Sequence, residues 1–234
     1  MSDDAALRIT EIARYHGLSE RRREQLASLV DSLADDEHAP SAVRDRERAV
    51  DVHLADSLAA LDLGLFGAGQ ALLDIGAGAG FPGLPLAVAL PECRFTLLES
   101  QRRKCEFIAR AIAASGLANA TVVCARAEQW TAGLAASDVA LARALAPQPV
   151  VLEYAAPLLR VGGLLVDWRG RRDSEEERVA ARAARELGME LQRIERSTPF
   201  ALAREHHLHL FAKIGATPAR FPRRVGTARK RPLG

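Results

Sequence analysis

The sequence predicts an α/β protein with a seven-stranded, mostly parallel sheet and an N-terminal helical extension. Two observations lead to this prediction: from residue 71 onward short apolar runs alternate with segments of helical period, and the residues before that point carry helical periodicity alone. Strands that alternate with helices are typical of a parallel sheet covered on both faces. The chain has 234 residues, of which 48% are hydrophobic and 26% charged, so it is long enough for one large core.

Two amphipathic helices are predicted in the N-terminal part. The first begins at Ser19, and its apolar residues share one face: Leu26, Leu29, Val30 and Leu33. Pro40 interrupts this pattern. A second helix from about Arg44 carries apolar residues at helical spacing: Val50, Leu54, Leu58 and Leu61.

Seven apolar runs have the length and composition of strands. They lie at residues 71–75, 94–99, 120–125, 138–142, 162–168, 189–195 and 206–213. Helical periods fit between them at residues 83–90, 101–115, 147–159 and 173–187. About ten residues without a clear helical period join the last two strands, so we expect those strands to pair antiparallel at one edge of the sheet.

Charge is distributed unevenly, although the formal net charge is only +2. The segment from Lys213 to Gly234 contains seven Lys or Arg residues and no acid. Such a segment buries little apolar surface, so we expect it to stay extended unless it docks on an acidic partner; a solubilising tail is the alternative. We therefore divide the chain into a helical segment packed on the core (1–68), the core itself (69–213) and a basic extended tail (214–234).

The N-terminus, MSDDAALRIT, is acidic and lacks the basic-then-apolar order of a signal peptide. No apolar run of the sequence approaches the roughly 20 residues that span a bilayer. We therefore expect a cytoplasmic protein with no membrane partner.

The cysteines give no sign of a structural bond. Cys93, Cys105 and Cys124 are odd in number, widely spaced and free of any C-x-x-C pair. We interpret them as buried thiols, and we expect neither a disulfide framework nor a metal site.

The stretch DIGAGAGFPG, from Asp74 to Gly83, follows the first predicted strand and fits two cofactor motifs. Its last six residues match the G-x-G-x-x-G loop that binds dinucleotides, whereas its first seven place an acid before alternate glycines, Gly76, Gly78 and Gly80. A dinucleotide would bring a pyrophosphate next to Asp74, which is unfavourable. S-adenosylmethionine has no phosphate and carries an ammonium and a sulfonium, so the acid favours this cofactor.

Acids at the next two strand ends fit the nucleoside part of either cofactor, because ligands of open parallel sheets bind beyond the carboxyl ends of the strands. Glu99 ends the second strand, where its carboxylate can accept hydrogen bonds from both ribose hydroxyls. After the third strand, Glu128 or the backbone around Ala127 can meet the adenine edge. The alternative is that Glu128 is an exposed acid at a helix start.

Several motifs together resemble one known family. DIGAGAGFPGLPLA, TLLES, ARAE, the Arg in ALARALA and the tail TPARFPRRVGTARKRPL are similar to the bacterial small-subunit rRNA methyltransferase G family, also called glucose-inhibited division protein B, from about Val43 onward. The resemblance implies a class I S-adenosylmethionine-dependent methyltransferase fold, which is Rossmann-like. It also implies transfer of a methyl group to N7 of a guanine in the 530 loop of 16S rRNA, on free rRNA or on a small-subunit particle.

The resemblance assigns roles to residues that match the family's motifs. It implies that Gly76 and Phe81 contact the methyl donor, that Ala127 and Glu128 contact adenine, and that Arg143 lies at the active site. The element HLADS resembles an H-x-x-D-S motif that approaches the cofactor cleft, and we expect two of its residues to contact the RNA: His53 and Ser57. Spacing independently places these two on one helical face, with Asp56 close to it.

The chain departs from the family in two places. The family commonly has an Asn-Leu-Thr run where this chain has Ala39, Pro40 and Ser41, which leaves any contact of that Asn without a counterpart. The family often has an Arg beside the His at the start of the last strand, where this chain has His206 and His207. The simplest interpretation of His206 is a surface residue at a strand start.

The implied chemistry needs few catalytic groups. N7 of guanine carries no proton, so no general base and no catalytic cysteine are required, and catalysis reduces to positioning. Arg143 is the catalytic candidate, through a hydrogen bond to guanine O6 or to a phosphate. The alternative for Arg143 is a structural ion pair with Glu99 or Asp74.

Basic clusters supply the expected RNA surface, because a guanine in a loop is reached by a protein that also contacts the backbone phosphates. We expect six basic residues to contribute: Arg169, Arg171, Arg172, Arg223, Arg224 and Lys230. We also expect a monomer. The competing hypotheses are a small-molecule methyltransferase of the same fold, a non-catalytic rRNA-binding assembly factor and a dinucleotide oxidoreductase.

Overall fold

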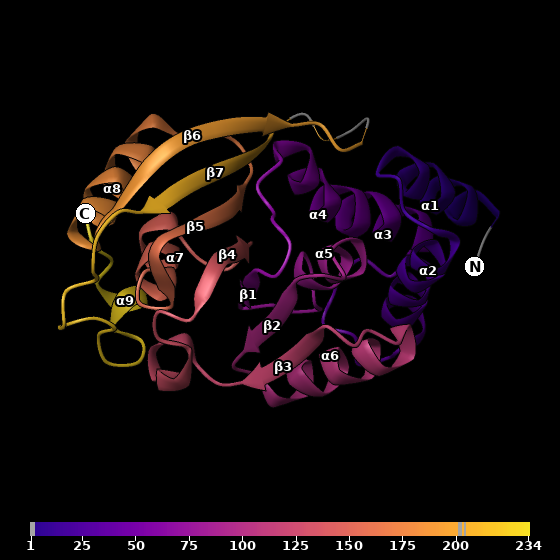
Figure 1. Cartoon of the computed structure of the whole chain (residues 1–234), viewed down its shortest axis with the longest axis horizontal. Helices are drawn as coiled ribbons and strands as arrows, with labels where there is room; N and C mark the ends of the chain where they lie inside the picture. The colour runs from indigo at the N-terminus through magenta and orange to yellow at the C-terminus, as the bar shows by residue number, and fades with distance from the viewer. Residues whose placement is uncertain (1–2, 201–202, 204) are drawn as a thin grey trace.

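A seven-stranded sheet crosses the middle of the computed structural model, which describes residues 3–200, 203 and 205–234 (Figure 1). Its strands are β1 (Ala71–Ile75), β2 (Arg94–Glu99), β3 (Ala120–Cys124), β4 (Ser137–Arg143), β5 (Leu159–Arg169), β6 (Met189–Ser197) and β7 (His206–Lys213). Their order is β3-β2-β1-β4-β5-β7-β6. The first five are parallel to one another, and β7 pairs antiparallel with both β5 and β6, which confirms the predicted antiparallel edge.

The strand order of the sheet reverses between β1 and β4, and the site lies beside this reversal. β2 and β3 lie to one side of β1, whereas β5, β7 and β6 lie beyond β4. Open α/β sheets bind ligands at the carboxyl ends of the strands beside such a reversal. Three candidate residues lie at or next to these ends: Asp74 in β1, Glu99 in β2 and Arg143 in β4.

The first face of the sheet is covered by the N-terminal helices together with α5 and α6. Their bounds are α1 (Asp3–Tyr15), α2 (Glu20–Asp35), α3 (Arg46–Ala49), the π-helix η1 (Val50–Ala55), α4 (Asp56–Leu58), the 3-10 helix η2 (Ala59–Leu63), α5 (Gly83–Ala89) and α6 (Arg102–Ser115). The predicted second helix is therefore present as one run from α3 to η2, with a wider π turn inside it. Ser19 is the N-cap of α2, as predicted.

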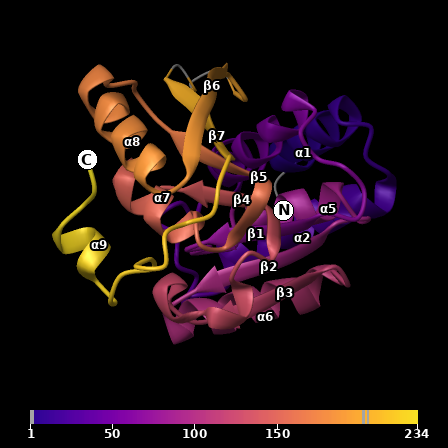
Figure 2. The same ribbon diagram turned by 60° about the vertical axis from the view of Figure 1, so that its left-hand side comes forward.

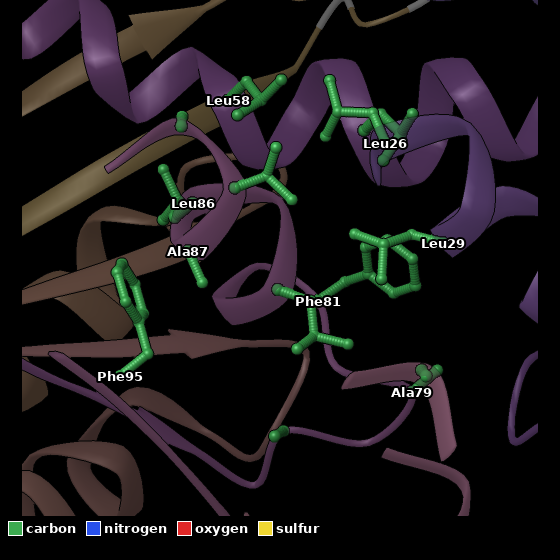
Figure 3. Packing of buried hydrophobic residues seen from close by; sticks show 14 of the residues in the cluster. Leu26, Leu29, Leu58, Ala79, Phe81, Leu86, Ala87 and Phe95 are labelled. Atoms are coloured by element: carbon green, nitrogen blue, oxygen red, sulfur yellow. The ribbon is translucent and has the colours of Figure 1, made fainter. Parts of the chain in front are cut away.

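The N-terminal helices share one apolar core with the sheet. Figure 3 shows Leu58 of α4 above Leu86 of α5, with Phe95 of β2 below them and Leu26 of α2 farther to the right. All four side chains are fully or almost fully buried in the same cluster. Burial of large apolar side chains contributes about 1.5–3 kcal/mol each, so this contact ties the N-terminal segment firmly to the core.

The opposite face is covered by α7 (Gln148–Ala155) and α8 (Ser174–Glu186), with the short helix α9 (Thr227–Lys230) beside α7 (Figure 1). Two 3-10 turns, η3 (Ala127–Gln129) and η4 (Thr131–Gly133), follow β3. Three alanines of α8 are fully buried against this face, Ala180, Ala183 and Ala184. Small side chains let the helix lie close to the sheet.

The C-terminal segment is docked on the protein and is not an extended tail. Figure 2 shows it in yellow, running from β7 to α9. Phe221 and Ala228 are buried in the second apolar cluster, and Arg223 forms an ion pair with Glu153 of α7. The acids that hold this basic segment belong to the chain itself: Glu128, Glu153 and Glu186.

Two of the three cysteines are paired, which corrects the expectation of free thiols. Cys105 of α6 and Cys124 at the end of β3 form a disulfide with a Cα–Cα distance of 5.8 Å. They meet because α6 runs back along the sheet to β3, so residues 19 positions apart in sequence become neighbours. Cys93 is a buried thiol, as expected. Within the described part of the chain, none of the helices combines the length and apolarity needed to cross a bilayer.

Candidate active site

The loop from Gly76 to Gly83 connects β1 to α5 and owes its shape to glycine. Gly76, Gly78 and Gly80 have φ angles of +70°, +60° and +89°, which side chains rarely adopt. A Cβ on Gly76 would lie 2.3 Å from Leu145 Cδ1, and one on Gly80 would lie 2.4 Å from Leu84 Cδ1. A Cβ on Gly78 would meet nothing closer than 3.8 Å, so this glycine faces open space.

That open space belongs to a cavity of about 330 Å³ above the loop. Its walls come from the ends of β1, β2 and β4, from the N-terminal segment, from α6 and from the C-terminal segment. The residues that matter below are Pro40, Ser41, His53, Gly76, Gly78, Phe81, Glu99, Lys104, Arg143 and Arg229. The cavity has the size of a small-molecule site, which usually occupies about 300–1,000 Å³.

Glu99 forms one wall of this cavity as a fixed acceptor. Its Oε1 accepts hydrogen bonds from the backbone N–H groups of Ser100 (2.7 Å) and Gln101 (2.8 Å). Its Oε2 accepts from the N–H of Gly78 at 3.1 Å. These donors orient the carboxylate. The Ser100 hydroxyl also lies 3.4 Å from Oε1, so Oε2 is the oxygen that keeps acceptor capacity toward the cavity.

Asp74 lies beneath the glycine loop and not in the cavity wall. Its side chain is fully buried, and Oδ2 accepts a hydrogen bond from the N–H of Gly83 at 2.8 Å. Burial raises the pKa of this carboxyl to about 7, against the lowering effects of the Gly83 hydrogen bond and the Arg143 charge. Asp74 therefore does not line the cavity, where the sequence predicted that it would meet the cationic end of the donor. It links β1 to the start of α5 instead.

A smaller hollow of about 60 Å³ lies next to the cavity and is lined by Ala127 and Glu128, as well as by Gly76. This arrangement places the two predicted adenine contacts beside the glycine loop. Glu128 also holds the C-terminal segment, since its Oε1 accepts a hydrogen bond from the N–H of Gly226 at 3.1 Å. Arg229 lines both hollows, a role that sequence reasoning missed.

Arg143 is held at the cavity by three partners from the N-terminal helices. Its NH1 group donates to Asp56 Oδ2 at 2.9 Å and to the carbonyl of Val52 at 3.0 Å. Its NH2 group lies 3.0 Å from His53 Nδ1. The structural partner of Arg143 is therefore Asp56, and not Glu99 or Asp74 as the alternative supposed. With 15% of its side chain exposed, Arg143 still lines the cavity.

His53 is neutral and its tautomer follows from its neighbours. Burial, with help from the Arg143 charge, lowers the pKa of His53 to about 4. Arg143 only donates, so Nδ1 accepts from it, and the ring proton lies on Nε2, 3.1 Å from the hydroxyl of Ser41. The ring also stacks on Phe81 at a centroid distance of 4.8 Å. His53 therefore connects the glycine loop to the N-terminal segment.

The interpretation of His206 as a plain surface residue is wrong. Its Nδ1 lies 2.8 Å from Asp56 Oδ1, and this hydrogen bond raises the pKa of His206. Asp56 is thus the junction of the site, although sequence reasoning noted it only as a neighbour of His53 and Ser57. Its position three residues after His53 on one helix was the available signal.

Two of the predicted RNA contacts are structural. Ser57 is fully buried and its hydroxyl donates to the carbonyl of His53. Arg223 forms a two-point ion pair with Glu153, whose side chain is only 1% exposed. The hydrogen-bonding groups of both side chains are therefore engaged inside the protein, as is usual for buried polar groups. Neither side chain is positioned to bind RNA.

The other predicted basic residues lie at the surface to different degrees. Arg169 is half-buried and donates to the carbonyl of Ala146 at 2.9 Å. Arg172 pairs with Glu177 at 2.7 Å. Three others are exposed: Arg171, Arg224 and Lys230. Two further cations, Lys104 and Arg229, line the cavity itself. Among the residues with described positions, no three His, Cys, Asp or Glu side chains are grouped as metal ligands.

Comparison with solved structures identifies the fold. A fibrillarin from Aeropyrum pernix, solved with natively bound S-adenosyl-L-methionine, has a TM-score of 0.55 at 18% identity and covers 68% of this chain and 76% of its own. A SAM-dependent methyltransferase from Aquifex aeolicus also has a TM-score of 0.55, at 14% identity, over 70% and 91% of the two chains. The predicted class I methyltransferase fold is therefore confirmed.

Comparison of sequences identifies the family. A ribosomal RNA small subunit methyltransferase G from Synechococcus sp. (strain JA-2-3B'a(2-13)) is 40% identical over 190 residues, which covers 78% of this chain and 73% of the relative. One from Chloroflexus aggregans is 39% identical over 223 residues and 92% of each chain. The sequence profile of the rRNA small subunit methyltransferase G family matches residues 23–208. The chain belongs to this family.

Proposed function

We propose that this protein transfers a methyl group from S-adenosylmethionine to N7 of a guanine in the 530 loop of 16S rRNA. The observation that carries the proposal is the cavity between the glycine loop, Glu99 and Arg143 in a chain of this family. The loop and Glu99 fit a nucleoside-containing methyl donor, and Arg143 brings a hydrogen-bond donor to the same space.

The residues of the cavity favour S-adenosylmethionine over a dinucleotide. In a dinucleotide site the loop N–H groups point at a pyrophosphate. Here the N–H of Gly78 donates to the carboxylate of Glu99, so an acid stands where a phosphate would bind. Gly78 leaves open space for a ligand, and Glu99 Oε2, which accepts from the Gly78 N–H, keeps a lone pair that can accept a ribose hydroxyl. Ala127 and Glu128 would meet the adenine from the adjoining hollow.

The reaction asks the protein mainly to position its substrates. When bound, S-adenosylmethionine supplies an electrophilic methyl group on its sulfonium. N7 of guanine carries no proton, so the site needs no general base. His53 agrees with this, since both its ring nitrogens are engaged by neighbours and its pKa of about 4 keeps it neutral. Three of the five N–H donors of Arg143 bond to Val52, His53 and Asp56. The remaining N–H groups can donate to guanine O6 or to a phosphate.

The N-terminal segment completes the site on the RNA side. Pro40, Ser41 and His53 line the cavity opposite the sheet, so a guanine that reaches Arg143 would pass this segment. Exposed or cavity-lining cations are available for the backbone phosphates of a loop: Lys104, Arg171, Arg224, Arg229 and Lys230. We further propose that the enzyme acts as a cytoplasmic monomer without a metal, which size analysis and activity in the presence of a chelator would test.

The test is transfer of a labelled methyl group. The protein is incubated with labelled S-adenosylmethionine and, in parallel, with unmodified 16S rRNA, small ribosomal subunits and 23S rRNA. We expect label in 16S rRNA or in the small subunits and background counts in 23S rRNA. Binding to 16S rRNA without transfer would support an assembly factor instead. Equal labelling of both rRNAs, or of neither, would contradict the proposal.

A further inference from the structure

Asp56 lies between two cationic side chains that come from different strands. Its Oδ2 accepts from Arg143 of β4 at 2.9 Å, and its Oδ1 lies 2.8 Å from His206 Nδ1 of β7. Its side chain is only 6% exposed. A buried carboxylate with a partner on each oxygen cannot rotate without breaking one of the two bonds. The orientation that Asp56 offers to Arg143 is therefore set partly by His206.

The surroundings of His206 also define its charge. Asp56 of α4 raises the pKa of His206 through their hydrogen bond, while burial and the charge of Arg143 lower it; the net shift is upward from 6.5. Phe200 packs edge-on against the ring at a centroid distance of 5.5 Å. Trp168 of β5 donates Nε1–H to the carbonyl of Asp56 at 3.0 Å, which fixes the backbone beneath this pair. The pKa of His206 therefore lies above its ordinary value, because Asp56 favours the protonated ring.

We propose that His206 is a positioning residue for the methyl transfer. In its protonated form it and Arg143 hold the two oxygens of Asp56, and the guanidinium of Arg143 is kept in place at the cavity. Loss of the proton from His206 weakens its bond to Asp56, because hydrogen bonds between ionised groups are roughly twice as strong as neutral ones. The orientation of Asp56 is then held less firmly, and Arg143 is less well aligned at the cavity. The inference rests on the proposed function of Arg143.

The pH dependence of turnover is the readout that separates this role from a merely structural one. The acceptor N7 does not titrate in the neutral range, and His53 has a pKa of about 4. Asp74 and Asp167, which have pKa values raised to about 7, titrate in the wild type and in the variants alike. A difference between the wild type and a His206 variant thus reports on His206.

The experiment measures kcat with 16S rRNA or small subunits, and the KM for S-adenosylmethionine, from about pH 6 to about pH 8.5. The variants are His206→Arg, which is charged throughout, and His206→Gln, which is neutral throughout. His207→Gln is the matched control, because the neighbouring His207 is half-buried and bonds the carbonyl of Gly170, away from Asp56.

We expect kcat of the wild type to fall by about tenfold as the pH rises through the pKa of His206. His206→Arg should remain near the upper level and His206→Gln near the lower level across the range. His207→Gln should follow the wild type, and KM for S-adenosylmethionine should change little in any variant. If His206→Gln has the same profile as the wild type, the inference is wrong.

A second measurement does not depend on activity. The imidazole resonances of His206 are followed by NMR as a function of pH in the wild type, in Asp56→Asn and in Arg143→Ala. We expect the pKa of His206 to fall in the first variant and to rise in the second, because one removes an attracting charge and the other a repelling charge. An unchanged pKa in both variants would overturn the inference. Absence of methyl transfer by the wild type, with these shifts present, would contradict the proposed function and leave only the coupling of His206, Asp56 and Arg143.

Discussion

Arg223 in the C-terminal segment and Glu153 in α7 are joined by two hydrogen bonds, from Nε to Oε1 at 2.7 Å and from NH2 to Oε2. Glu153 is almost completely buried. The same Arg223 NH2 donates to the carbonyl of Arg231, so the pair also fastens the end of the chain. Arg223, which the sequence predicted as an RNA contact, thus holds the segment 214–234 against α7 on the opposite face of the sheet.

We predict that Arg223→Ala destabilises the fold. Removal of the guanidinium leaves the Glu153 carboxylate buried without its partner, which typically costs about 3–5 kcal/mol. Each kcal/mol corresponds to about 2–4 °C of Tm in a chain of this size. Arg224→Ala is the matched control, because Arg224 is exposed beside it. Thermal unfolding of the two variants is the measurement. Equal Tm values would show that the Arg223–Glu153 ion pair does not stabilise the fold.

RNA binding by the C-terminal segment is expected to depend on its exposed cations. Neutralising Arg224 and Lys230 together should weaken binding of 16S rRNA at low salt and flatten its salt dependence by a slope of about 0.7–0.9 per lost phosphate contact. Affinity for S-adenosylmethionine should stay the same, since neither side chain lines the cavity. The measurement is a salt titration of RNA affinity. An unchanged slope would return these two residues to a solubilising role.

The buried Asp74 makes stability depend on pH. Its folded pKa of about 7 lies above its ordinary value of 3.8, so the folded state holds a proton that the unfolded state has released. Stability from this group therefore falls as the pH rises from about 4 through 7. Asp74→Asn keeps an oxygen for the Gly83 N–H but never ionises. We predict that its Tm relative to the wild type increases between about pH 5 and about pH 8. A constant difference would show that Asp74 does not titrate in this window.

The contribution of Arg143 to stability can be separated from its contribution to turnover. Arg143→Ala should lower turnover on rRNA by about ten- to a hundredfold, the value of one lost charge-assisted hydrogen bond. It should also lower Tm, because Asp56 loses a partner in a buried place. Adding Asp56→Asn should restore Tm and leave turnover low. Recovery of turnover in the double variant would mean that Arg143 acts only as the partner of Asp56.

Local pattern was enough to predict the sheet. The runs that form β1, β2 and β7 have the predicted bounds, because apolar strands between amphipathic helices leave little freedom in a parallel sheet. The glycine loop was also predictable, since Gly76, Gly78 and Gly80 need a backbone that only glycine adopts easily.

Contacts between distant parts of the chain could not be predicted. Asp56 meets Arg143 and His206 at separations of 87 and 150 residues, and Arg223 meets Glu153 at a separation of 70. Such pairs depend on the packed arrangement of whole elements, and side-chain periodicity carries no information on it. The disulfide between Cys105 and Cys124 has the same origin, because α6 returns along β3.

Chemical cleavage of the product RNA identifies the atom that receives the methyl group. Unmodified small subunits are treated with the protein and S-adenosylmethionine, and the 16S rRNA is then reduced and cleaved chemically at N7-methylguanine and mapped by primer extension. We expect one new cleavage, at a guanine in the 530 loop, which is present with the wild type and strongly reduced with Arg143→Ala. Cleavage at another position, or methylation that resists this chemistry and so lies on another atom, would show that the protein does not methylate N7 of a guanine in the 530 loop.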